Sequence, residues 1–340
     1  MTDLVETTSW LIDIPSVTGD EASLRDAIAD RLRDMPQQVV ADSLVVGAPK
    51  EGQVLLAGHL DTVPLQGHVG ARVEDERVHG LGATDMKGGL AVMIHLAEAL
   101  GPERVVCVFY AGEEGPLSGN QLGAVIDAAP WLRAASAAVV LEPTDRALEA
   151  GCQGAINADV VFIGEPAHSA RPWLGDNAVT KAGKFLVDMR GLEPELHVVN
   201  GLEFNEVVSV TTAHGGVAKN VIPSEFVLNV NYRFAPDRRP VDAVQRLHEV
   251  CAAADRVVVT DLAPSGSVDI DHALFQRLIE HTGASVLGKQ GWTDVAQLSA
   301  AGVPAVNFGP GESTLAHKPG ESVRISDLGW VYDSLLELLR

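Results

Sequence analysis

Apolar residues recur every three to four positions in several segments of the chain, which is the spacing of a helix that buries one face. The longest such segment, DMKGGLAVMIHLAEAL at 85–100, begins with an acidic residue, as many helices do. Near the N-terminus, Thr18 and Glu21 have the spacing of a capping box at the start of another helix. We expect helices at residues 3–14, 18–32, 85–100, 176–191, 240–254, 272–283 and 326–339.

Runs of β-branched and aromatic residues lie between these helices. Each run is apolar until it ends in polar residues, which is typical of a strand buried on both faces. Strands that alternate with helices indicate an α/β fold whose sheet is largely parallel. These strands are expected at VLLAGHLDTV (54–63), RVVCVFYAGEE (104–114), AAVVLEP (137–143) and AVNFGPG (305–311).

The middle of the chain has a different pattern. Segments 157–168, 205–216 and 226–236 are longer, and polar residues alternate with apolar ones along them. This alternation is typical of an antiparallel sheet with helices on one face. We therefore predict an α/β domain at residues 1–152 and 266–340, interrupted by an inserted α+β domain at residues 153–265.

Composition excludes some classes of partner. The 340 residues carry a formal net charge of −21, which argues against binding to nucleic acid or to an anionic membrane. We expect no membrane-spanning helix, because no apolar run reaches the roughly 18 residues that such a helix needs. The cysteines Cys107, Cys152 and Cys251 form no CxxC pair, and the first residues are acidic where a secretory signal would be basic. A reducing cytoplasm is the expected compartment.

Acidic and histidine side chains follow the expected strands at the ends where α/β proteins bind ligands. A single histidine or glutamate there is more often structural, but the joint pattern is hard to explain that way. Imidazole and carboxylate donors without cysteine suit zinc, cobalt or manganese, and this set could hold two ions about 3.5 Å apart with one carboxylate shared. The candidate residues are His59, Asp61, Asp85, Glu113, Glu114, Glu142 and His317.

Glu113 and Glu114 are adjacent in the sequence. On an extended strand, two neighbouring side chains point to opposite faces. We therefore expect one of them to bind metal and the other to face the substrate as a general base.

These residues lie in motifs that resemble a known family. The motifs GHLDTVP, GATDMKGG, YAGEEG, LEP, HSARPWLGDN and AH are similar to those of the M20 family of dinuclear zinc amidohydrolases and peptidases, and the resemblance covers nearly the whole chain. Within that family, EAGCQG, NVIP, NYRFAPDR, GWTDVAQLSAAGVPAVNFGPG and LAHK resemble the actinobacterial type of desuccinylase that acts on succinyl-diaminopimelate.

The resemblance implies a fold and a metal centre. The fold would be a zinc-peptidase-like catalytic domain with a mostly parallel mixed sheet, interrupted by a ferredoxin-like α+β dimerisation domain. Two Zn²⁺ ions per subunit are implied, with Co²⁺ as a substitute. His59 and Glu142 would bind one ion, Glu114 and His317 the other, and Asp85 would bridge them.

Further roles are implied at matching positions. Glu113 would be the general base and later the general acid. Asp61 would accept the second ring N–H of His59 and fix its tautomer. His168, in the inserted domain, would stabilise the oxyanion in the partner subunit of a homodimer. Asn220 and Arg233 would hold the carboxylates of the substrate, because a guanidinium suits such groups.

Thr293, in GWTD, would line the substrate pocket. Two stretches depart from the family pattern. KPGE follows His317 where many members carry asparagine before the glutamate, and GEEGPLSGN differs from the CEE form of similar desuccinylases. Both departures leave the expected metal ligands in place, but the second weakens the substrate assignment.

The implied reaction is hydrolysis of N-succinyl-L,L-2,6-diaminopimelate, a small acyl-amino acid, to succinate and L,L-diaminopimelate, a step of lysine and diaminopimelate biosynthesis. Three alternatives remain open. Deacetylation of N-acetylornithine or N-acetyl-lysine would use the same chemistry in a different pocket. A non-catalytic amino-acid-binding protein would have no need of Glu113, and a glycosidase with paired carboxylates would leave His59, Asp85 and His317 unexplained.

Overall fold

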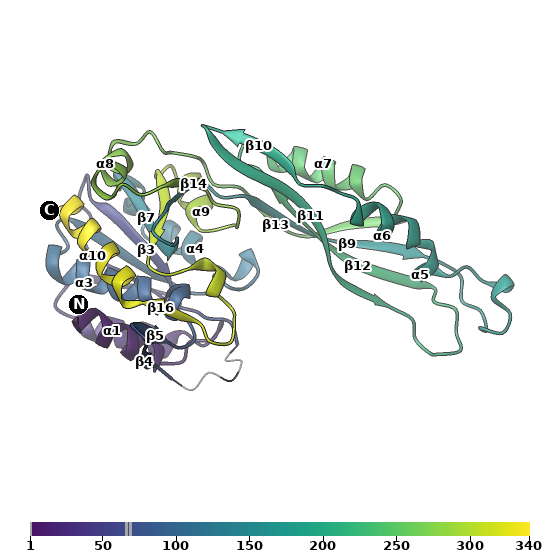
Figure 1. Ribbon diagram of the computed structural model, residues 1–340, viewed down its shortest axis with the longest axis horizontal. Coiled ribbons are helices and arrows are strands. Elements are labelled where there is room, and N and C mark those ends of the chain that lie inside the picture. Colours follow the sequence, from purple (N-terminus) through teal and green to yellow (C-terminus); the bar gives the residue numbers. More distant parts are fainter. Residues whose placement is uncertain (1, 65–66, 68–69) are drawn as a thin grey trace. The chain divides into compact units, whose positions relative to one another are not determined.

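The computed structural model describes residues 2–64, 67 and 70–340. The described chain folds into two compact units (Figure 1). The mixed-sheet unit comprises residues 1–151, 266–288 and 293–340, and the inserted unit comprises residues 152–265 and 289–292. Among the described residues, no helix has both the length and the apolar character needed to cross a bilayer.

In the described part of the mixed-sheet unit, eight strands form one sheet in the order β1-β2-β6-β3-β7-β15-β8-β14. The central neighbours β6, β3, β7 and β15 run parallel to one another. The strands are β1 (Gln37–Val40), β2 (Ser43–Val46), β3 (Val54–His59), β6 (Val105–Tyr110), β7 (Ala137–Pro143), β8 (Leu148–Ala150), β14 (Val286–Gly288) and β15 (Ala305–Gly309). A small separate sheet joins β16 (Ser322–Arg324), β5 (Arg77–His79) and β4 (Arg72–Glu74).

Helices cover this mixed sheet. Helix α3 is apolar on nearly every side because it lies between β3, β6 and β7 and the helices α1 and α10. The helices are α1 (Thr2–Ile12), α2 (Ala22–Arg31), α3 (Gly88–Leu100), α4 (Leu122–Ala128), α8 (Ala273–Thr282), α9 (Val295–Ala300) and α10 (Ile325–Leu339). Short helical turns are η1 (Ala83–Lys87), η2 (Leu117–Gly119), η3 (Pro130–Ala134) and η5 (Ser313–Leu315).

In the described part of the inserted unit, five strands form an antiparallel sheet in the order β10-β11-β12-β9-β13. Without the hairpin strand β10, the chain order is that of a ferredoxin-like βαββαβ unit. Its elements are β9 (Gly154–Ile163), η4 (Pro172–Leu174), α5 (Ala178–Lys181), α6 (Gly183–Arg190), β10 (Glu195–Val199), β11 (Leu202–Gly215), β12 (Glu225–Phe234), α7 (Pro240–Val250) and β13 (Arg256–Ala263).

The two faces of this antiparallel sheet differ. Along β12, Phe226, Leu228 and Val230 point into a core that also contains Phe185 and Leu247 from the helices. Polar residues alternate with them, and on that other face the amide groups of Asn229 and Asn231 both donate to Oδ1 of Asn157. This alternation explains why the sequence pattern of the middle segment predicts the sheet.

The predicted fold class is confirmed as a mixed, mostly parallel α/β sheet with a separate antiparallel domain. Two local predictions are wrong. Asp85 does not begin helix α3, because its φ and ψ of −127° and 91° lie outside the helical region, and the helix begins at Gly88. The helix expected at 176–191 is two helices, which meet at Ala182 and Gly183.

The capping box expected at Thr18 and Glu21 is also absent from the described residues. Glu21 is the N-cap residue of α2, but its side chain makes no capping hydrogen bond and instead accepts from the N–H of Gly19. The hydroxyl of Thr18 donates to Asp61 over 3.0 Å. The side chain of Thr18 therefore bonds to a residue distant in sequence instead of capping its own helix.

Candidate metal centre

Parallel neighbouring strands bring most of the candidate ligands to one edge of the sheet. His59 ends β3, and Glu142 lies near the end of β7 beside it. Glu113 and Glu114 follow the end of β6, and His317 lies in the loop after β15. The carboxyl ends of parallel strands lie at the same edge, which is where open α/β sheets bind ligands.

Two glycines place Asp85 next to these residues. A Cβ at Gly89 would collide with the carbonyl oxygen of Leu141, so only glycine lets the start of α3 lie so close to β7. A Cβ at Gly58 would lie 2.7 Å from the side chain of Leu90. The glycines of β3 and of the DMKGG motif therefore allow the helix to pack tightly on the sheet, with Asp85 at the ligand-binding edge.

Asp85 lies between the two histidines. Its Oδ1 is 3.0 Å from Nε2 of His59, and its Oδ2 is 3.3 Å from Nε2 of His317. Glu142 Oε1 is 3.6 Å from Nε2 of His59, and Glu114 Oε1 is 2.8 Å from Nε2 of His317. Nε2 of each histidine thus lies near one oxygen of the shared Asp85 and near one glutamate that the other histidine does not share.

The donor set fits divalent metal ions. Ligand atoms of His59, Asp85 and Glu114 all lie within 4.8 Å of one another. The side chains of Glu114 and Glu142 are 8% and 9% exposed, so these carboxylates are withdrawn from water and need compensating positive charge. Nitrogen and oxygen donors without sulfur suit zinc, cobalt and manganese.

His317 reaches the centre through an unusual backbone conformation. Its φ is 60°, in the left-handed region that costs a residue with a Cβ roughly 1–2 kcal/mol. In this conformation, Nε2 of His317 lies within reach of both Glu114 and Asp85. Strain of this kind is typical of residues held for function.

A comparison of sequences places the chain in a family. A profile of peptidase family M20/M25/M40 matches residues 55–340. The chain belongs to this family. The family expected from the motifs is thereby confirmed.

Relatives in this family differ in their described activities. The chain is 38% identical to a protein of Mycobacterium tuberculosis (strain H37Rv) described as a putative succinyl-diaminopimelate desuccinylase, and the match covers 99% of this chain and 98% of the relative. It is 30% identical to the acetylornithine deacetylase of Myxococcus xanthus, with coverages of 96% and 92%. A tripeptidase structure from Staphylococcus aureus matches with a TM-score of 0.82 at 21% identity, covering 99% of this chain and 97% of that one, which supports the fold alone.

The hydrogen bonds of Asp61 differ in part from those expected. Nδ1 of His59 is 2.9 Å from the main-chain carbonyl oxygen of Asp61 and 3.6 Å from its carboxylate. The carboxylate instead accepts from the main-chain N–H groups of Glu113 and Glu114, each over 3.0 Å. Burial opposes ionisation of Asp61, but His59 and these two N–H groups lower its pKa to about 2.

The two glutamates lie in a turn after β6 rather than on the strand itself. The prediction that strand alternation separates their side chains is therefore wrong, because the turn sets their directions. The pKa of Glu113 is raised well above its ordinary value, first by burial and then by the nearby carboxylates of Glu142, Asp294 and Glu114, although His59 opposes the shift.

The remaining expected site residues lie in other places. Thr293 belongs to the mixed-sheet unit and is buried. His168, Asn220 and Arg233 belong to the inserted unit. His168 and Asn220 are exposed on adjoining loops, where the N–H of Ser169 donates to the carbonyl oxygen of Asn220. Arg233 lies on β12, and its Nε donates to Oδ1 of Asn231 over 3.1 Å.

Sequence patterns did not point to several supporting residues. Thr18 donates to Asp61, and the buried Lys87 donates to the carbonyl oxygens of Leu11 and Ile14 at the end of α1. Burial lowers the pKa of Lys87 to about 7. Glu321 accepts from main-chain groups of the Asp85 turn. The basic residue after Asp85 was visible in DMKGG, but its partners lie about 70 residues away and are set by the fold.

A second cluster of possible donors lies in the inserted unit. Glu195, His197 and Glu206 also bring ligand atoms within 4.8 Å of one another. However, Arg238 donates from Nε and Nη2 to the two carboxylate oxygens of Glu206, over 2.7 and 2.9 Å. A guanidinium already supplies the positive charge there, so this cluster is an ion-pair network.

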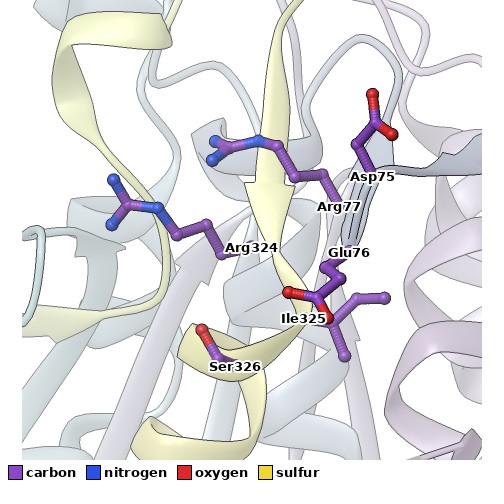
Figure 2. Close-up of a pocket in the computed structure, with 6 residues that line it drawn as sticks. All are labelled: Asp75, Glu76, Arg77, Arg324, Ile325 and Ser326. Atoms are coloured by element: carbon purple, nitrogen blue, oxygen red, sulfur yellow. The ribbon is translucent and has the colours of Figure 1, made fainter.

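A cavity of about 580 Å³ lies beside the small sheet, where β5, β16 and the start of α10 meet. Figure 2 shows Arg77 and Arg324 extending their guanidinium groups to the same side, away from Ser326. Both bind Glu312, which lies on the loop that carries His317. The arginines of this cavity are therefore engaged in holding the His317 loop.

Proposed function

We propose that this chain is a dinuclear metal-dependent amidohydrolase that removes the succinyl group from N-succinyl-L,L-2,6-diaminopimelate. The observation that carries the chemistry is the position of Asp85, whose two oxygens each meet Nε2 of a different histidine. The 38% identity over nearly the whole chain to a protein described as a putative succinyl-diaminopimelate desuccinylase supports the substrate.

In this proposal, the metal ligands have fixed roles. His59 and Glu142 would hold one ion, His317 and Glu114 would hold the other, and Asp85 would be shared by both. Zinc is the expected metal, and cobalt can substitute because it accepts the same nitrogen and oxygen donors. When bound, the two ions make water a better nucleophile at neutral pH and polarise the amide carbonyl.

Glu113 moves the proton. Its carboxylate takes a proton from the attacking water as the new C–O bond forms, and it then gives that proton to the leaving nitrogen as the C–N bond breaks. The second proton of the water passes from the new carboxyl group to the released amine, so the products are succinate and the ammonium form of the amine, and atoms and charge balance. Asp61 orients this base, because it accepts the main-chain N–H of Glu113.

The inserted unit contributes to substrate binding in the proposed enzyme. Arg233 and Asn220 hold carboxylates of the substrate, since a guanidinium pairs well with such groups. Thr293, in the mixed-sheet unit, lines the substrate pocket. His168 donates a hydrogen bond to the developing oxyanion of the partner subunit in a homodimer. The homodimer and the cytoplasmic location remain predictions.

Deacetylation of N-acetylornithine is the second candidate, and the 30% identity to an acetylornithine deacetylase supports it. The chemistry would be the same, and only the pocket for the acyl group would differ. Purified protein loaded with zinc should be tested on succinyl-diaminopimelate, N-acetylornithine and N-acetyl-lysine. We expect the highest kcat/KM for succinyl-diaminopimelate, whereas a higher value for either acetylated substrate would overturn the substrate assignment.

A further inference from the structure

Glu321 connects two segments that carry proposed metal ligands. It lies four residues after His317, directly before β16, and it is 1% exposed. Its Oε1 accepts from the main-chain N–H of Thr84 over 3.0 Å and from that of Asp85 over 3.1 Å. One carboxylate oxygen thus holds the turn that presents Asp85.

The main chain of Glu321 also forms hydrogen bonds to both neighbouring segments. Its carbonyl oxygen accepts from the N–H of Gly80, and its own N–H donates to the carbonyl oxygen of Lys318, both over 3.1 Å. Glu321 is therefore bonded to the segment before Asp85 and to the loop that carries His317. It is attached to both sides of the metal centre.

The same loop is held at a second point. Arg77 donates to Glu312 over 2.6 Å, and the carbonyl oxygen of Glu312 lies 3.4 Å from the hydroxyl of Thr84. A Cβ at Gly311 would collide with that hydroxyl, so the loop also packs closely on the Asp85 turn there. Thr84 is buried, and Glu321 is the acceptor for the N–H groups of Thr84 and Asp85.

We propose that Glu321 is a positioning residue for the metal centre, which fixes Asp85 relative to His317 by accepting the N–H groups of Thr84 and Asp85. The inference rests on the proposed role of Asp85 as the shared ligand. A bridging carboxylate has to meet both ions at once, so a small rotation of its turn weakens both contacts. Residues that orient metal ligands are typically worth 10–100-fold in metal affinity.

Two variants of similar size distinguish the loss of the hydrogen-bond acceptor from the loss of side-chain packing. Glu321→Gln keeps an acceptor oxygen at the same distance from the backbone, whereas Glu321→Met fills the space without one. We expect zinc dissociation constants, measured by chelator competition, to rise 10–100-fold in Glu321→Met and to stay within about fivefold of the wild-type values in Glu321→Gln. Equal zinc affinity in the two variants would overturn the inference.

A matched control lies in the inserted unit. Glu206 is also a buried carboxylate that accepts a main-chain N–H, that of Ala235, but it belongs to the ion-pair network of Arg238. Glu206→Met should lower stability and leave both zinc dissociation constants within about twofold of wild type. A loss of zinc affinity as large as that of Glu321→Met would mean that general destabilisation explains the effect, and the inference would fail.

Amide hydrogen exchange in zinc-free wild-type protein tests the contact without any variant. If Glu321 holds the turn, the amides of Thr84 and Asp85 exchange slowly before zinc is added. Exchange at the rate of exposed amides would overturn the inference even if Glu321→Met failed to fold. Failure of the wild-type protein to bind zinc would instead overturn the proposed function. Slow exchange at Thr84 and Asp85 in that protein would show that the Glu321 contact exists, so the two failures can be distinguished.

Discussion

The main-chain N–H of Ala170 donates a hydrogen bond to Nδ1 of His168 over 3.0 Å. A main-chain N–H can only donate, so this nitrogen carries no proton, and in the neutral ring the proton lies on Nε2. The exposed edge of His168 is therefore a hydrogen-bond donor. This is the tautomer that stabilisation of an oxyanion requires.

The first prediction concerns His168. His168→Ala should lower kcat about 10²–10³-fold, the usual effect of removing one oxyanion donor, with zinc content unchanged because the residue is no proposed ligand. Steady-state kinetics and mass-spectrometric metal analysis measure both. Mixing His168→Ala with Glu113→Gln protein should restore activity, because some heterodimers have one complete site. Continued inactivity after confirmed subunit exchange would rule out the cross-subunit role.

Glu113→Gln tests the proton carrier. The variant should keep two zinc ions, because the proposed ligands are untouched, and should lose about 10²–10⁴-fold in kcat, the usual range for general acid–base catalysis. Zinc content and single-turnover rates are the measurements. A fully metallated variant with near-normal kcat would show that another group moves the proton.

Removal of Asp85, Glu142 or His317 should have different effects on the two zinc sites. Asp85→Ala should weaken both metal sites, since each of its oxygens lies near a different histidine nitrogen. Glu142→Ala and His317→Ala should each weaken mainly one site. Zinc stoichiometry measured at a series of free-zinc concentrations distinguishes these outcomes. Equal losses in all three variants would argue against a bridging Asp85.

The strand ends could be predicted from the sequence because each buried strand is a continuous apolar run that stops at a polar residue. His59, Glu142 and the pair after β6 were found in this way. The short strands β4, β5 and β16 have no such run, since each is three residues long and they are stabilised by pairing with one another. Local patterns carry little information about elements of that kind.

Contacts between distant segments explain what the sequence did not reveal. The spacing of Thr18 and Glu21 suits a local cap, but the hydroxyl of Thr18 has a tertiary partner in Asp61. The helical pattern of 85–100 extends back to Asp85, but the turn there is bound to Glu321, more than 200 residues away. Such pairs are set by the packed fold, so spacing along the chain cannot show them.

Acid should weaken the inserted unit through Glu206. Burial would raise the pKa of Glu206, but Arg238, Tyr232 and the N–H of Ala235 outweigh it and lower the pKa below its ordinary value. The folded state therefore binds this proton less readily than the unfolded state does. Stability from the ionised group is full above the unfolded pKa, and it is lost as pH falls through the lowered folded pKa.

Urea unfolding of wild type and Glu206→Gln measures this contribution. At pH 7 the variant should be less stable by about 1.5–3 kcal/mol, the usual value of hydrogen bonds to a charged group. The difference should shrink as pH falls below the usual range of a glutamate pKa. A difference that stayed constant down to pH 3 would show that the charge of Glu206 is not its source.

The most direct test of the central claim is anomalous diffraction at the zinc edge from crystals grown with zinc. The account predicts two peaks in each chain, one beside Oδ1 of Asp85 with His59 and Glu142, and one beside Oδ2 with His317 and Glu114. A single peak in zinc-saturated crystals, or two peaks of which only one contacts Asp85, would contradict it.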